Sequence, residues 1–109
     1  MTITARNIFA GASVPPGLEQ CLTLFESATV RVERIVSNAH SSPAGFWYDQ
    51  PEDEWVMVLR GQATLEFNDG ESVAMRAGDH VTIAGHVRHR VSETDAETIW
   101  LAVHVKPQL

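Results

Sequence analysis

The stretch "GDHVTIAGHVRHRV", from Gly78 to Val91, contains two short strand patterns on either side of a tight, glycine-containing loop. Side chains alternate between the two faces of a strand, so His89 and Val91 share one face while Arg88 and Arg90 point to the other. An inward histidine at this place can be a metal ligand, a general base or a hydrogen-bonded structural residue.

The same strand rhythm runs from Thr29 to Val105, with about eight short segments separated by turn residues. Asp69-Gly70 is a strong signal for a tight hairpin turn between two of them. Short, regularly spaced strands predict an antiparallel β-sandwich or barrel, and we take residues 29–109 as that barrel.

Residues 1–28 are expected to form an N-terminal arm and one short helix, within one structural domain overall. Leu18, Cys21, Leu22 and Phe25 fall at i, i+3, i+4 and i+7, which is the spacing of an amphipathic helix. We expect this helix to cover an open end of the barrel.

The composition is that of an ordinary globular domain, with 109 residues of which 44% are hydrophobic and 20% are charged. The net charge of −6 and the scattered basic residues argue against nucleic acid and anionic membranes as partners. No signal peptide or membrane-spanning run is recognisable, so we expect a cytoplasmic protein. Cys21 is the single cysteine, which excludes an internal disulfide and a cysteine-based zinc cluster.

A second stretch, "GFWYDQPEDEWVMVLRG" from Gly45 to Gly61, gives the chain a family resemblance. Cupins carry the motifs G-x5-H-x-H-x3,4-E-x6-G and G-x5-P-x-G-x2-H-x3-N. Glu54 and Gly61 keep the spacing that ends the first motif, and Gly78, Asp79 and His89 keep the frame of the second. Over roughly residues 29 to 105, the chain therefore resembles a small single-domain cupin of the RmlC-like type.

The chain departs from both motifs at functional positions. The two histidines of the first motif are replaced by Trp47 and Asp49 in one register, or by Tyr48 and Gln50 in the other. In the second motif, Ala84 stands for the proline and His86 for the glycine, and the final asparagine is missing.

The resemblance implies a double-stranded β-helix, or jelly roll, with a pocket inside the barrel. Many cupins hold iron, manganese, nickel or zinc on the histidines and glutamate of the motifs, and others hold no metal. Their activities include dioxygenases, isomerases and epimerases, as well as non-catalytic binding of sugars or effectors.

Glu54 and His89 are the leading site candidates. If Asp49 also enters the barrel, the three residues supply one nitrogen and two oxygen donors, which suit iron(II), manganese or zinc, and His86 could add a second nitrogen. Without an ion, two neighbouring carboxylates would repel, and one could serve as a general acid or base.

Four further residues are candidates for ligand binding. Tyr48 and Gln50 offer a hydroxyl and an amide that suit the orientation of a ligand. Trp47 supplies aromatic surface for packing or for a pocket wall. Arg34 interrupts an apolar face and could clamp an acidic group from inside, unless the inner face of its strand is instead Arg31, Glu33 and Ile35.

His104 shares a face with Trp100 and Ala102, and we expect it to be a packed core or interface histidine. The segments "WVMVLR" and "TIWLAVHV" are apolar on both faces, so one face needs a cover outside the barrel. That pattern predicts a homodimer.

Three functions follow from these patterns. The first is a metal-dependent enzyme of oxygenase or isomerase type that acts on a small molecule in the barrel. The second is a non-catalytic binding cupin without a metal, and the third is a dimeric scaffold whose polar residues satisfy one another.

Overall fold

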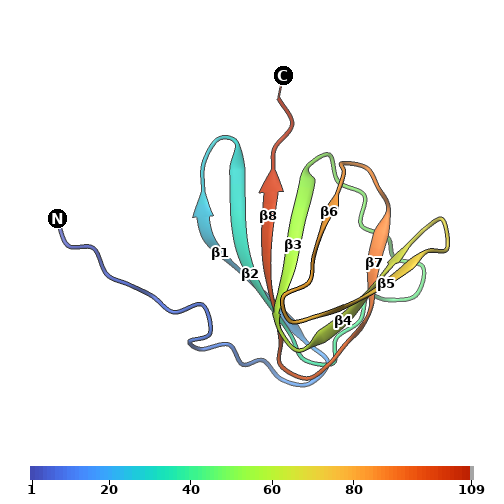
Figure 1. Cartoon of the computed structure of the whole chain (residues 1–109), viewed down its shortest axis with the longest axis horizontal. Helices are drawn as coiled ribbons and strands as arrows, with labels where there is room; N and C mark the ends of the chain where they lie inside the picture. Colours follow the sequence, from blue (N-terminus) through green and yellow to red (C-terminus); the bar gives the residue numbers. More distant parts are fainter. Residues whose placement is uncertain (109) are drawn as a thin grey trace.

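The computed structural model describes residues 1–108, so the last residue of the expected 29–109 barrel lies outside the described part. The described chain is built from strands and loops (Figure 1). The strands are β1 (Glu19–Glu26), β2 (Val30–Ser37), β3 (Asp53–Arg60), β4 (Gln62–Phe67), β5 (Ser72–Arg76), β6 (His80–Ile83), β7 (His89–Thr94) and β8 (Thr98–Val105).

The strands form two antiparallel sheets that face each other. The larger has the order β1-β2-β8-β3-β6 and the smaller the order β5-β4-β7. In the larger sheet, Ile35 is opposite Trp100 and Val56 is opposite Ala102, which fixes one common inner face for β2, β3 and β8. The expected all-β fold with two antiparallel sheets is confirmed.

The expected N-terminal helix is wrong, because its residues form β1 at the edge of the larger sheet. The ladder shifts by one residue between Thr23 and Phe25, a β-bulge. This bulge puts Leu22 and Phe25, three residues apart, on the same outer face, opposite Arg34 and Val32 of β2. The helix-like spacing is therefore a property of a bulged strand.

The core lies between the two sheets. It contains Val56, Val58, Ala63, Leu65, Met75, Ile83, Trp100 and Ala102, each at most 4% exposed. Several of these side chains also line a cavity, so the core forms the cavity's inner end.

Gly61, the last glycine of the first motif, joins β3 to β4, and its surroundings show why only glycine fits there. Its φ of +86° lies in the left-handed region, and a Cβ at this position would come within 2.7 Å of Thr98 Oγ1 and 2.9 Å of Thr98 Cα. Gly61 therefore permits both the turn and the close approach of β8.

The N-terminal segment runs along the outside of the barrel and then projects away from it (Figure 1). Arg34, which is 6% exposed, fixes this segment by donating from Nη1 to the carbonyls of Ile8 (3.2 Å) and Ala10 (2.6 Å). The guanidinium of Arg60 lies 4.6 Å from the ring centre of Phe9 and adds a cation–π contact.

Candidate functional site

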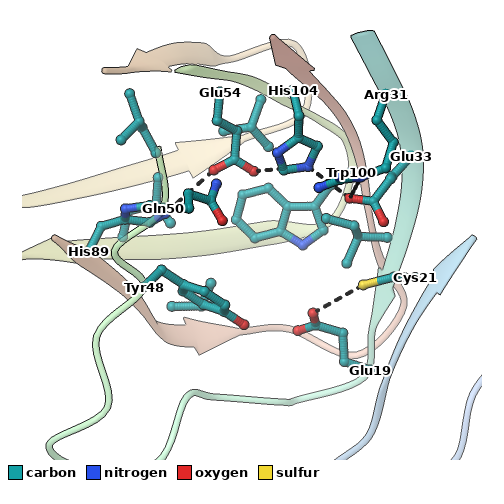
Figure 2. Close-up of a pocket in the computed structure, with 15 residues that line it drawn as sticks. Glu19, Cys21, Arg31, Glu33, Tyr48, Gln50, Glu54, His89, Trp100 and His104 are labelled. Atoms are coloured by element: carbon teal, nitrogen blue, oxygen red, sulfur yellow. Dashed lines mark hydrogen bonds and ion pairs between the residues drawn. The ribbon is translucent and has the colours of Figure 1, made fainter. Parts of the chain in front are cut away.

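A cavity of about 170 Å³ opens between the sheets. Figure 2 shows its polar side chains gathered from strands that are distant in sequence. The lining residues are Glu19, Cys21, Arg31, Glu33, Ile35, Tyr48, Gln50, Glu54, Val56, Leu65, Ile83, His89, Val91, Trp100 and His104.

Glu54 and His89 meet in this cavity, as the motif spacing predicts. Glu54 comes from the start of β3 and His89 from the start of β7, and Glu54 Oε1 lies 3.4 Å from His89 Nε2. Both side chains are nearly buried, at 12% and 6% exposure. On its other side, His89 Nδ1 lies 2.9 Å from the carbonyl oxygen of Val87, which orients the ring so that Nε2 faces the carboxylate.

The surroundings of His89 raise its pKa above the ordinary value of 6.5. Burial is the largest single effect and acts in the opposite direction, because it disfavours the imidazolium. The hydrogen bonds to Glu54 and to the Val87 carbonyl, together with the charge of Glu54, outweigh it. His89 therefore keeps its proton to a higher pH than a free histidine and is suited to act as a general acid beside a carboxylate base.

The first-motif histidines are replaced at the cavity by Tyr48 and Gln50. Tyr48 forms a β-bridge with His89, through backbone hydrogen bonds of 2.7 and 3.1 Å, and its ring stacks on the His89 ring at 5.5 Å. Burial, followed by the charges of Glu19, Cys21 and Glu54, raises the pKa of Tyr48, which keeps its hydroxyl a hydrogen-bond donor.

The other-register residues lie outside the cavity. Asp49 Oδ1 and His86 Nδ1 form a pair at 2.9 Å, with side chains 46% and 71% exposed. His86 adopts a φ of 64°, and its backbone N–H donates to the Gln50 carbonyl at 2.7 Å, which turns its side chain toward solvent-exposed Asp49. Trp47 is half-buried and does not line the cavity.

Arg34 does not face the cavity either. Its strand presents Arg31, Glu33 and Ile35 to the inside, the alternative that the sequence left open, and Arg34 is bound to the N-terminal segment. The physical reason is that the N-terminal segment covers the outer face of β2. The apolar residues of β2 that suggested an inner face are therefore buried under this segment, outside the barrel.

The expected metal ligands Glu54, His89, Asp49 and His86 do not converge. Within residues 1–108, no group of three or more His, Cys, Asp or Glu side chains has a geometry that could hold a metal ion. Tyr48 and Gln50, which occupy the first-motif histidine positions, are poor substitutes for imidazole donors. The donor set at this site does not fit the cupin metal centre.

A chain of ionisable groups extends from Glu54 along the cavity wall, and the sequence analysis missed it (Figure 2). His104 Nε2 lies 3.7 Å from Glu54 Oε2 and 2.7 Å from Glu33 Oε1. Its Nδ1 lies 4.0 Å from Glu52 Oε1. These contacts are ion pairs rather than hydrogen bonds, and neither ring nitrogen of buried His104 has a hydrogen-bond partner within residues 1–108.

Cys21 and Glu19 of β1 complete the wall, where a helix was expected. Cys21 Sγ lies 3.7 Å from Glu19 Oε1, and Glu19 Oε2 lies 3.3 Å from His40 Nε2. Although Cys21 is partly exposed, desolvation first, and then Glu19, Glu33 and Glu54, raise its pKa to about 12. The thiol is therefore no ready nucleophile. If residues 19–26 had been recognised as a strand paired with β2, the register would have placed Glu19 and Cys21 on the same face as Ile35.

Comparison with known proteins gives the class of the chain. The cupin domain family model matches residues 33–104, and the chain belongs to this family. It is a small single-domain cupin, as the motifs predicted. No protein of curated function matches the sequence significantly. Residues 1–108 contain no helix long and apolar enough to cross a membrane.

Solved structures support the fold. A Ralstonia eutropha JMP134 protein, provisionally named a mannose-6-phosphate isomerase, is 44% identical, with a TM-score of 0.87 over 96% of this chain and 100% of that one. KdgF from Halomonas sp. is 15% identical, with a TM-score of 0.72 over 88% and 86% of the chains. An RmlC-like cupin from Shewanella frigidimarina NCIMB 400 is also 15% identical, with a TM-score of 0.71 over 88% and 83%.

Proposed function

We propose that this cupin is an isomerase-type enzyme that moves a proton within a small carbonyl compound, with Glu54 as the base and His89 as the acid. The observation that carries the proposal is the buried Glu54–His89 pair, 3.4 Å apart at a cavity, with the pKa of His89 raised. Catalytic groups with perturbed pKa values and mutual contact in a cleft are typical of proton-transfer sites.

The reaction balances without an added reagent. With an α-hydroxy carbonyl substrate, Glu54 takes a proton from the hydroxyl-bearing carbon beside the carbonyl group, and His89 protonates the carbonyl oxygen, which gives an enediol. The hydroxyl on the carbon that lost its proton then returns a proton to His89, and the proton on Glu54 is delivered to the former carbonyl carbon. The hydroxyl of Tyr48, held protonated, is placed to orient the reacting oxygen.

The name of the Ralstonia protein favours this reaction class, since aldose–ketose isomerisation is such a proton shift. We therefore test a panel of aldoses and ketoses, including mannose and mannose 6-phosphate, in deuterium oxide. Deuterium gained beside the carbonyl group, followed by NMR, reports proton transfer.

The test uses matched variants. We expect exchange with the natural chain, a loss of about a hundredfold or more with Glu54→Gln or His89→Ala, and no change with Glu93→Gln, an exposed glutamate on the same strand as His89. If the natural chain binds a ligand but catalyses no exchange, the proposed enzyme is contradicted, and the non-catalytic binding cupin becomes the favoured function.

A metal-dependent enzyme is the competing function, and metal content decides it. The protein is purified without a histidine tag and assayed for iron, manganese, nickel and zinc. Stoichiometric metal that is lost in both Glu54→Gln and His89→Ala would overturn the metal-independent mechanism. We expect no such metal, because Tyr48 and Gln50 stand where two imidazoles would be required.

We also propose that the chain forms a homodimer through the part of the outer face of its larger sheet that the N-terminal segment leaves exposed. Leu22 and Phe25 are 45% and 59% exposed there, and Trp55, Met57, Leu101 and Val103 of β3 and β8 are only half-buried. A contiguous apolar sheet face of this kind usually marks a protein interface.

A further inference from the structure

We propose that the cavity selects uncharged or cationic small molecules and rejects phosphorylated or carboxylated ones. The inference rests on the proposed function only in taking this cavity as the ligand site. It would hold equally for an enzyme and for a binding protein.

Carboxylates supply most of the charged side chains of the cavity wall. Glu19, Glu33 and Glu54 line it from three different strands, and Arg31 is the one Lys or Arg side chain among its lining residues. His89 adds a positive charge when it is protonated, but it lies 3.4 Å from Glu54, which balances it. Figure 2 shows these carboxylates on opposite sides of the space rather than in one surface cluster. An anion placed among them would meet repulsion from each, in a setting of reduced solvent screening.

The Arg31 guanidinium is already paired with two carboxylates. Its Nη1 and Nη2 donate to the two oxygens of Glu52 at 3.1 and 3.4 Å, and its Nε lies 3.6 Å from Glu33 Oε1. Each Nη nitrogen keeps one further N–H, but the carboxylates of Glu52 and Glu33 already balance the guanidinium charge, so an anion gains little attraction from it.

His104 gives a second, independent sign of a ligand's polar group. It is 5% exposed, and although Nε2 makes an ion-pair contact with Glu33, neither ring nitrogen has a hydrogen-bond partner within residues 1–108. A buried polar side chain without a partner usually marks the place of a water molecule or a ligand group. Beside Glu33 and Glu54, that group would be a hydroxyl or an amine, which can donate to the carboxylates.

The negative charge of the glutamates also affects the pKa values of two other side chains in the wall. The glutamates raise the pKa of the Cys21 thiol and of the Tyr48 hydroxyl, in addition to the effect of burial. The cavity thus disfavours a negative charge on its own side chains.

The size of the cavity limits the part of a ligand that enters. Its volume of about 170 Å³ is close to that of an engineered cavity, about 150 Å³, that holds benzene. A single sugar ring or a small amine fits, and longer ligands extend through the opening.

Cys21 allows a test that does not require the natural ligand. It is the single cysteine and lines the cavity, so its rate of modification reports the local potential. Three methanethiosulfonates of similar size are compared, carrying a trimethylammonium group, no charge or a sulfonate, at one fixed, mildly alkaline pH. Each rate is divided by that of a small free thiol.

We expect the ratio of cationic to anionic reagent rates to exceed the free-thiol ratio by about tenfold or more, which corresponds to about 1.4 kcal/mol. Glu33→Gln and Glu54→Gln should each lower it severalfold, and Glu93→Gln should leave it unchanged. A reversed ratio would overturn the inference, and a ratio equal to that of the free thiol would overturn it if a second reporter position gives the same result.

A second reporter guards against poor access to Cys21. In a Cys21→Ser background, Gln50→Cys places a thiol on another part of the wall. The same preference is expected there, and its absence at both positions contradicts the inference. A failure of proton exchange in the Glu54 and His89 assays, by contrast, removes the proposed reaction and leaves the charge preference standing.

Discussion

His89 shows how one contact sets the chemistry of a residue. Glu54 and the Val87 carbonyl raise the pKa of His89, whereas burial lowers it. Replacing Glu54 removes part of the effect that offsets burial. We predict that Glu54→Gln lowers the pKa of His89, measured by NMR titration of its ring protons. An unchanged titration would show that the 3.4 Å contact does not form in solution.

The same shift makes stability depend on pH. A histidine whose pKa is raised on folding contributes stability that is fully present below its unfolded value of 6.5 and is lost as pH rises through the folded value. We predict that the natural chain loses free energy of unfolding over this interval, and that Glu54→Gln shows a smaller loss. Urea unfolding at several pH values measures both.

Arg34 binds the N-terminal segment through two carbonyl oxygens. Arg34→Gln should remove these charged hydrogen bonds, at a cost of about 2 kcal/mol, and release the segment. Limited proteolysis is then expected to cut residues 1–18 faster than in the natural chain. Equal cleavage rates would mean that other contacts hold the segment.

At the scale of elements, Gly61 makes a sharp test of the β3–β4 connection. Gly61→Ala would strain the backbone and force β8 away, because the new Cβ meets Thr98. Gly70→Ala is a matched control, since Gly70 also has a positive φ but no neighbour within 4 Å. We predict a loss of about 1 kcal/mol for the control and about 2–4 kcal/mol for Gly61→Ala, measured by urea unfolding.

Of the about eight strands expected after Thr29, the seven from β2 to β8 were predictable because alternation and turn residues agree with the sheets, but the one expected around Tyr48 is only an isolated bridge. β1 was not, because its bulge gives Leu22 and Phe25 the spacing of a helix. Glu54 and His89 could be brought together from motif spacing alone. The Tyr48 register could not, since that segment makes only an isolated bridge to His89 rather than a strand whose alternation could be counted.

The sequence left open whether Arg31 and Glu33 or Arg34 would face the inside, for a related reason. Hydrophobic alternation normally marks the inner face of a strand, but in β2 the apolar residues Val32 and Val36 lie on the outer face. The N-terminal segment covers that outer face and is bound there by Arg34.

At the scale of the whole molecule, the outer face of the larger sheet predicts the assembly. Light scattering coupled to size-exclusion chromatography should give a dimer mass for the natural chain. Leu101→Glu, which puts a charge on that face, should shift the mass to that of a monomer. Val87→Glu is the control, since Val87 is 40% exposed in a loop away from the sheet face, and it should stay dimeric.

β1 connects the cavity to the dynamics of the molecule. It supplies Glu19 and Cys21 to the cavity wall, yet it is an edge strand with one neighbour and mostly exposed side chains. Elements with few buried contacts open most readily, so amide hydrogens of β1 should exchange with solvent faster than those of β8 at the sheet centre. A bound ligand that touches Glu19 would slow that exchange, and the least stable strand would then report occupancy of the cavity.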